Sequence, residues 1–193
     1  TPRKYGQNCR MPRHTYRIGR ACLLAGLVCM ATPVWAAHAY GQFGDIRYPA
    51  AFSHFSYVNP QAPKGGSIVL VPPTRQSNFD KYNPFTLKGS APPGMLSMVF
   101  DTLLTGNMDE PTTAYGLLAS DIQVAPDHMS VTFELNPLAR FHNGDPVLAA
   151  DVGHSFERLT SQQAAPQYRT YFGEVKSATV LGERRIRFDF VHP

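Results

Sequence analysis

The first 36 residues have the composition of an export leader rather than of a folded domain. Three arginines precede an apolar run over residues 21–31, and small residues follow Pro33 at 34–39. A basic segment, an apolar segment and a small-residue cleavage site, in this order, are typical of a secretory signal peptide. The sequence therefore predicts a protein that is exported to the periplasm and folds only from about residue 37 onward.

The boundaries of this leader follow from its motifs. Met11 stands directly before the basic segment, so residues 1–10 are interpreted as an upstream extension and 11–36 as the signal peptide. A-x-A-like sites end at Ala36 and at Ala39, and Ala36 is preferred because Pro33 lies closer to it. The apolar run of about 11 residues reaches roughly 16 Å, about half of a bilayer core, which argues against a retained membrane helix.

Removing the leader changes the charge and the cysteine content. The leader holds six of the 18 Lys and Arg residues and none of the acids, which leaves 12 bases against 14 acids. A slightly acidic product gives no reason to expect a nucleic-acid partner. All three cysteines (Cys9, Cys22, Cys29) lie in the leader, so the exported product has no thiol for disulfides or catalysis.

Three segments carry the pattern of β-strands. Apolar and polar residues alternate over 130–135, directly after a turn at 125–128, which predicts a strand-turn-strand unit. The same alternation on both sides of Gly182 predicts a β-hairpin over 175–190. The β-branched run at 67–71 follows a glycine pair and predicts a first, buried core strand.

Two segments carry helical spacing. Met95, Met98, Val99 and Leu103 share one helical face and predict a short helix within 94–104. A longer helix is expected to begin at Asp145-Pro146, with Asp145 as its cap. Strands and helices alternate without a strict βαβ rhythm, so the fold class is α/β (mixed α+β).

Four motifs, in order along the chain, resemble the extracytoplasmic solute-binding proteins of ABC transporters, in the oligopeptide/dipeptide class. They are Asn83-Pro84-Phe85, Phe100-Asp101-Thr102-Leu103-Leu104, Val131-Thr132-Phe133-Glu134-Leu135, and Phe141-His142-Asn143-Gly144-Asp145-Pro146-Val147 continuing to Leu159. A narrower likeness to the YejA-like branch comes from Tyr48-Pro49, Phe52 to Phe55, Tyr57 to Pro60, Ala62 to Gly66, and Asp109-Glu110-Pro111. One departure is Leu148, where the class usually has a threonine that caps the helix.

The resemblance implies a two-lobed periplasmic-binding-protein fold (class II, peptide-binding type) that is incomplete here. Residues 37–193 would be the amino-terminal part of the solute-binding domain, comprising the first lobe and its inserted subdomain. The resemblance further implies a monomeric, non-enzymatic protein without cofactors. It would capture oligopeptides or peptide-like compounds and deliver them to the permease subunits of an ABC importer in the inner membrane.

Candidate ligand contacts lie in the polar and aromatic loop after the predicted first strand. Ligands of open α/β sheets bind beyond the carboxyl ends of strands. The candidates are Gln76, Ser77, Asn78, Tyr82 and Asn83. A solvated surface loop without ligand contact is the alternative.

A second grouping, His142, Asn143, Asp145, Asp151 and His154, has the residue types of a metal or acid–base site but not the spacing of one. It is interpreted as a turn and helix start. An extracytoplasmic hydrolase or amidase on a similar scaffold stays open as the alternative function, although no nucleophile-elbow or zinc-protease motif is present in this sequence.

Overall fold

The computed structural model describes residues 37–69 and 79–193. The chain divides into two units, residues 1–33 and 34–193, and every described residue belongs to the second unit. The expected signal peptide, residues 11–36, therefore lies outside the described residues. Within them, no helix is both long enough and apolar enough to cross a membrane.

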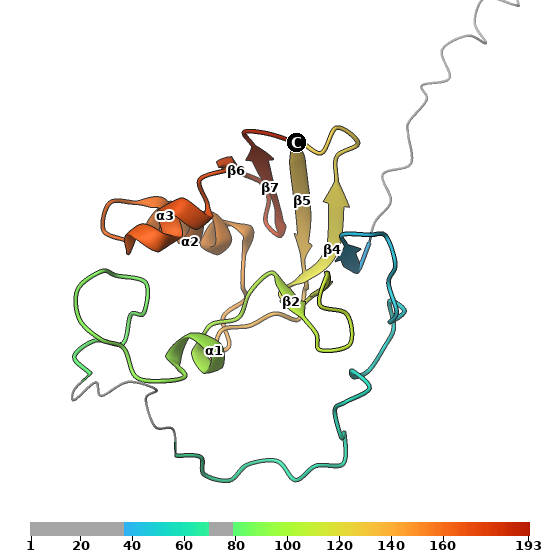
Figure 1. Cartoon of the computed structure of the whole chain (residues 1–193), viewed down its shortest axis with the longest axis vertical. Helices are drawn as coiled ribbons and strands as arrows, with labels where there is room; N and C mark the ends of the chain where they lie inside the picture. The colour runs from blue at the N-terminus through green and yellow to red at the C-terminus, as the bar shows by residue number, and fades with distance from the viewer. Residues whose placement is uncertain (1–36, 70–78) are drawn as a thin grey trace, which may run out of the picture. The chain divides into compact units, whose positions relative to one another are not determined.

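The main sheet has four antiparallel strands in the order β4-β5-β7-β6 (Figure 1). Strands β4 (Ala119–Val124) and β5 (Ser130–Leu135) are joined by the predicted turn, in which the His128 N–H donates to the Ala125 carbonyl at 2.9 Å. Strands β6 (Val175–Gly182) and β7 (Arg185–Phe190) form the predicted hairpin. Both strand predictions are confirmed.

A second, smaller sheet has the order β1-β3-β2 and is antiparallel throughout. Its strands are β1 (Ala39–Gly41), β2 (Leu104–Gly106) and β3 (Thr113–Gly116). An isolated bridge between Ala37 and Ile122 connects the start of β1 to the edge of β4. Strands of three or four residues are too short for an alternating pattern, which explains why the sequence did not predict them.

Three helices are present among the described residues: α1 (Met95–Val99), α2 (Ala149–Thr160) and α3 (Pro166–Tyr171). Helix α2 packs on β6 and β7, and Phe156 contacts Phe188 with ring centroids 5.6 Å apart. Gly153 allows this close approach, because a Cβ there would lie 3.4 Å from the Val180 side chain. One apolar face of the main sheet is thus covered along β6 and β7.

The structure has two hydrophobic clusters. The larger one lies between α2 and the main sheet, where Leu135 and Ile186 are fully buried. The smaller one surrounds Tyr115 of β3, which is also fully buried and packs against Ala39 and Tyr48. The two clusters give each sheet its own core.

One sequence prediction about packing is wrong. Ile68 and Val69 of the predicted first strand are 71% and 87% exposed and lie in no strand; residues 70 and 71 are outside the described part. A strand needs a partner edge, and the described residues offer none to Ile68 and Val69. Helix α1 forms as predicted; none of its residues is fully buried, whereas Leu103 of the predicted face packs against the larger hydrophobic cluster.

The start of α2 also differs from the prediction. The helix begins at Ala149, and Leu148 occupies the N-cap position with an extended backbone (φ −112°, ψ 160°). Asp145 does not cap it, because its carboxylate accepts a hydrogen bond from the Asn143 amide at 2.7 Å within the preceding turn. The Asp151 carboxylate instead accepts the Leu148 N–H at 2.8 Å.

Candidate ligand-binding site

Residues 79–90 form the described part of the loop that holds the predicted ligand contacts. Lys81 Nζ donates to the Thr86 carbonyl at 2.6 Å, and the Asp80 carboxylate accepts the Ser90 N–H at 2.8 Å. These short-range bonds fold the loop onto itself. It is a shaped segment rather than an extended connection.

The loop is anchored to the helical part of the fold through Phe85. The Phe85 carbonyl accepts the Ala165 N–H at 2.8 Å, next to the bridge between Thr86 and Ala164. The Phe85 ring makes edge contacts with Phe100 at 4.9 Å and Tyr168 at 5.4 Å between centroids. Two segments, one at Phe100 and one at residues 164–168, therefore hold one side of the loop in place.

The other side of the loop presents aromatic surface to solvent. Phe79 is 54% exposed and Tyr82 is 70% exposed, and their rings meet edge to face at a centroid distance of 5.6 Å. An exposed aromatic pair offers large apolar contact area, and Tyr adds a hydroxyl that can bond a ligand. Phe79 belongs to the same loop but was not among the predicted contacts.

The remaining predicted contacts fall into two groups. The Asn83 side-chain oxygen accepts the Phe85 N–H at 2.8 Å, so this oxygen shapes a turn two residues on. Gln76, Ser77 and Asn78 lie outside the described residues. Ligand contact by these four residues and by Tyr82 remains a prediction.

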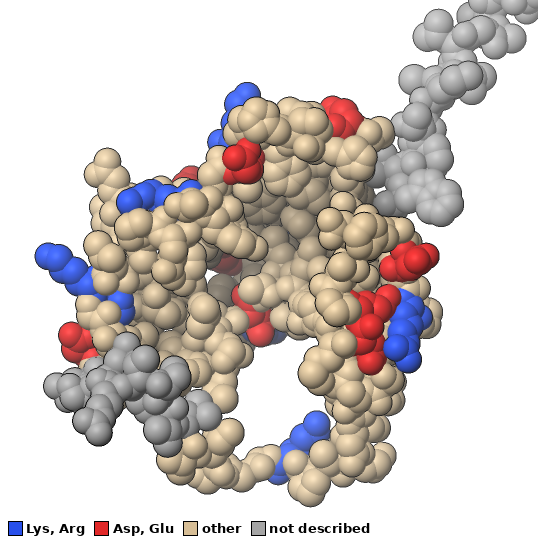
Figure 2. Space-filling view, viewed as in Figure 1, with Lys and Arg blue, Asp and Glu red and all other residues tan. Residues whose placement is uncertain are grey.

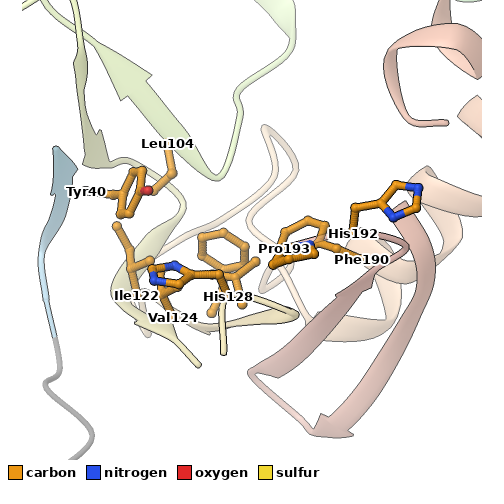
Figure 3. A pocket seen from close by; sticks show the side chains of 10 residues that line it. Tyr40, Leu104, Ile122, Val124, His128, Phe190, His192 and Pro193 are labelled. Atoms are coloured by element: carbon orange, nitrogen blue, oxygen red, sulfur yellow. The ribbon is translucent and has the colours of Figure 1, made fainter. Parts of the chain in front are cut away.

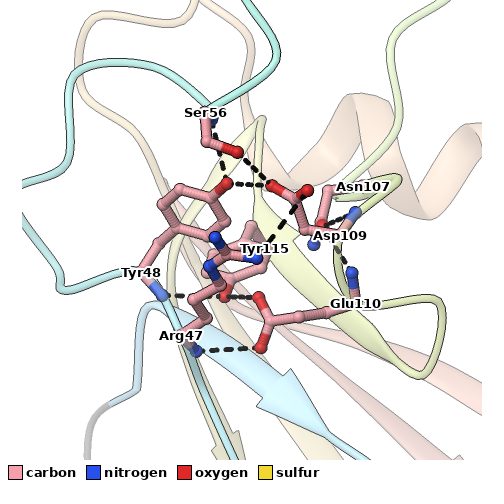
Figure 4. A network of polar contacts seen from close by, with 7 residues as sticks. All are labelled: Arg47, Tyr48, Ser56, Asn107, Asp109, Glu110 and Tyr115. Carbon is pink, nitrogen blue, oxygen red and sulfur yellow. Dashed lines mark hydrogen bonds and ion pairs between the residues drawn. The ribbon is translucent and has the colours of Figure 1, made fainter.

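A polar network that sequence reasoning missed joins two distant motifs (Figure 4). The Tyr48 hydroxyl donates to the Asp109 carboxylate, which also accepts the Ser56 hydroxyl at 2.7 Å. The Tyr115 hydroxyl donates to the Glu110 carboxylate at 2.5 Å and accepts the Tyr48 N–H at 3.1 Å. Tyr48 and Asp109 both belong to the motifs that resemble the YejA-like branch. That resemblance was the one signal in the sequence that pointed to these residues.

The network is electrostatically biased. Hydrogen bonds from Tyr48 and Ser56, with the nearby Arg47 guanidinium, lower the pKa of Asp109 below its usual value. Burial and the hydrogen bond to Glu110 raise the pKa of Tyr115. Asp109 therefore stays ionised and Tyr115 neutral at ordinary pH, which is the state that these bonds require.

Aromatic packing completes the same region. Tyr48 and Tyr115 meet edge to face at 5.7 Å, and Phe52 and Phe55 both contact Tyr115, at 5.4 and 5.6 Å. The segment 47–58 contains no helix or strand, so side chains rather than a backbone ladder fasten it to β3. We interpret the network as a structural clasp and not as a reaction centre.

The grouping around His142 has the turn geometry expected of it. Gly144 has a φ of 93°, and the Phe141 N–H donates to the Asp145 carbonyl at 2.9 Å across the turn. His142 and His154 are exposed. Among the residues that the structure describes, no three His, Cys, Asp or Glu side chains lie close enough to hold a metal ion.

An apolar pocket of about 460 Å³ lies on the main sheet (Figure 3). Phe133 and Val131 of β5 line it from the same face that α2 covers farther along, because residues two apart on a strand share a face. The β4 and β5 part of this face is therefore open. The full lining is Tyr40, Leu104, Ile122, Val124, His128, Val131, Phe133, Phe190, His192 and Pro193.

The described part of the loop carries Asp80, Lys81 and Lys88, whereas the residues that line the pocket include no Lys, Arg, Asp or Glu. Figure 2 shows Lys and Arg interspersed with Asp and Glu over the visible face. Among the described residues, two ion pairs form, Arg47 with Asp109 and Arg187 with Asp189, and both are partly exposed.

Comparison with known proteins identifies the class. Residues 113–193, which contain the whole main sheet and α2, match the family described as bacterial extracellular solute-binding proteins, family 5 Middle. The match bears out the class that the sequence motifs indicated.

Individual relatives extend the likeness over most of the chain. It is 39% identical over 158–160 residues to two proteins, one of them named probable peptide-binding protein YejA, from Agrobacterium fabrum. It is 31% identical over 182 residues to the peptidoglycan-binding protein YepA of the same organism. These two Agrobacterium matches cover 83% and 91% of this chain but only 25% and 28% of the relatives.

Among solved structures, the chain resembles NikA from Brucella suis in complex with Fe(III)-EDTA. The identity is 25%, the TM-score is 0.49, and the match covers 57% of this chain and 22% of NikA. The described strands and helices themselves establish the mixed α/β class.

Proposed function

We propose that the protein is the periplasmic solute-binding component of an ABC importer and that its ligands are oligopeptides or peptide-like compounds. The observation that carries the proposal is the family match of residues 113–193, the part that forms the main sheet. The name of the Agrobacterium relative YejA supports peptides as the ligand class. Because the chain spans about a quarter of the length of this relative, the activity of the whole protein is part of the proposal.

In this proposal the protein binds and releases its ligand without chemical change. Residues 37–193 contribute the first lobe and its inserted subdomain, and later residues supply the second lobe. The loop that includes 79–83 lies on the wall of the cleft between the lobes. Phe79 and Tyr82 pack against ligand side chains, while polar groups of the loop bond the peptide backbone.

Loss of one aromatic contact gives a direct test. In the complete gene product, Tyr82→Ala should weaken peptide binding, measured by calorimetry, roughly 2- to 13-fold, the range for 0.5–1.5 kcal/mol. Tyr171→Ala is the matched control, because Tyr171 is 80% exposed but lies on α3 outside the loop. Equal losses in both variants would count against the loop as the contact surface.

The ligand class has its own test. Mass spectrometry of compounds that co-purify with the complete periplasmic protein should identify peptides. Peptidoglycan fragments, the class in the name of the second relative, are assayed beside a peptide library by calorimetry. Cleavage of the peptide by the purified protein would contradict the transport proposal and favour the hydrolase alternative.

A further inference from the structure

Residues 37–41, which we call the amino-terminal strap, hold the two sheets together. The Ala37 N–H donates to the Ile122 carbonyl at 3.2 Å, and the Ile122 N–H donates to the Ala37 carbonyl at 2.8 Å. One residue later, the His38 carbonyl accepts the Gly116 N–H at 2.8 Å. The strap thus starts on the edge of β4 and continues as β1 beside β3 (Figure 1).

The side chains of the strap are held as firmly as its backbone. Ala39 is only 2% exposed and belongs to the cluster around Tyr48 and Tyr115. His38 Nε2 lies 2.8 Å from the Tyr48 carbonyl, and its ring contacts Tyr115 at 6.0 Å. Each of the three residues 37–39 is therefore part of the folded structure.

The contacts of residues 37–39 distinguish between the two peptide bonds at which the leader motifs allow cleavage. Cleavage after Ala39 would remove the acceptors of the Ile122 and Gly116 N–H groups and the buried Ala39 methyl. Cleavage after Ala36 would keep all of them. The new α-ammonium group at Ala37 could still donate to the Ile122 carbonyl, and Ala37 is exposed enough for water to solvate its charge.

We infer that the exported protein is processed between Ala36 and Ala37, so that Ala37 is the first residue of the mature fold and the strap begins at the new amino terminus. The inference rests on the proposed export. Cleavage at either peptide bond would allow export, whereas only cleavage after Ala36 keeps the hydrogen bonds of the strap.

The complete gene product, expressed with a carboxy-terminal tag and recovered from the periplasm, provides the test. Amino-terminal sequencing should read Ala-His-Ala-Tyr. A product that begins at Tyr40 would overturn the assigned bond while leaving export intact. A product that retains the leader would overturn both proposals.

Two variants make the assignment independent of folding, because processing is read on pulse-labelled protein. Ala36→Leu should abolish the product that begins at Ala37, since the cleavage site requires a small residue. Ala39→Leu should still be cleaved after Ala36. The opposite pattern would overturn the inference.

The structural premise is tested by mature protein that lacks residues 37–39. It loses the three backbone hydrogen bonds of the strap, each of which contributes roughly 2- to 13-fold to the folding equilibrium. Thermal melting of the shortened and the full mature protein should therefore differ clearly. Identical melting would remove the physical reason for preferring the bond after Ala36.

Discussion

Helix α2 has the backbone of a capped helix without a capping side chain. Leu148 stands at the N-cap with the extended dihedrals that this position prefers, but its side chain has no oxygen. The Ala149 N–H already donates to the Glu183 carbonyl at 2.9 Å. The Asp151 N–H also has an acceptor, the Leu148 carbonyl at 3.0 Å. A hydroxyl at position 148 would therefore accept the N–H of residue 150, as in ordinary N-caps.

Leu148→Thr supplies that hydroxyl, and Leu148→Val is its matched control because valine has nearly the same shape. Both variants lose the same part of the half-buried leucine, so the difference between them isolates the cap. An N-cap threonine is worth about 1 kcal/mol, within a range of about 0.5–2. The shift per kcal/mol shrinks as a chain grows and is about 2–4 °C at 150–250 residues. The threonine variant of the longer gene product should therefore melt above the valine variant by less than about 2 °C per kcal/mol gained.

The assay is thermal melting of the complete gene product, with amide hydrogen exchange at residue 150 as a local readout. Exchange there should be slower in the threonine variant than in the valine variant. Equal melting temperatures together with equal exchange would refute the reasoning. They would mean that the first turn of α2 gains nothing from a side-chain acceptor at position 148.

Three further predictions concern the clasp and the open sheet face. Tyr48→Phe should lower the free energy of unfolding, because a hydrogen bond to the charged Asp109 is lost. Denaturant unfolding measures this loss against Tyr57→Phe, and equal effects of the two changes would contradict it. Because the fold lowers the pKa of Asp109, its carboxylate binds a proton more tightly in the unfolded chain than in the folded one. The free energy of unfolding should therefore fall as the pH drops below about 4. Asp109→Asn should make this fall less steep in thermal melts at acid pH. Residues 37–193 expressed alone should bind a hydrophobic dye at the apolar pocket. A sharp thermal melt without dye binding would show that the fold is stable without another segment packed over this pocket.

Much of the main sheet could be predicted because its strands alternate. Phe133 and Leu135 are buried as the alternation requires, and Ile186 is buried on the same face from the hairpin. The start of α2 was predicted wrongly because Asp145 can either cap a helix or stabilise a turn. Its turn with Asn143 satisfies its carboxylate before the helix begins.

The rest depends on contacts that local patterns do not encode. Tyr48 and Asp109 are 61 residues apart, and only the fold brings them together. The short strands β1 and β3 are likewise defined by pairing across the chain. In the loop, residue type correctly suggested an exposed Tyr82. The hydrogen bond from the Phe85 N–H to the Asn83 side-chain oxygen depends instead on the local backbone.

The strap has a consequence for the order in which the protein would fold during the proposed export. The amino end emerges first, yet Ala37 must wait for Ile122, about 85 residues later, before it can pair. Closing a loop of this length costs about 4 kcal/mol of chain entropy, whereas the hairpins β4-β5 and β6-β7 close over a few residues. The segment that leaves the translocation channel first is therefore among the last to find its place, and it remains open to chaperones and proteases in the meantime.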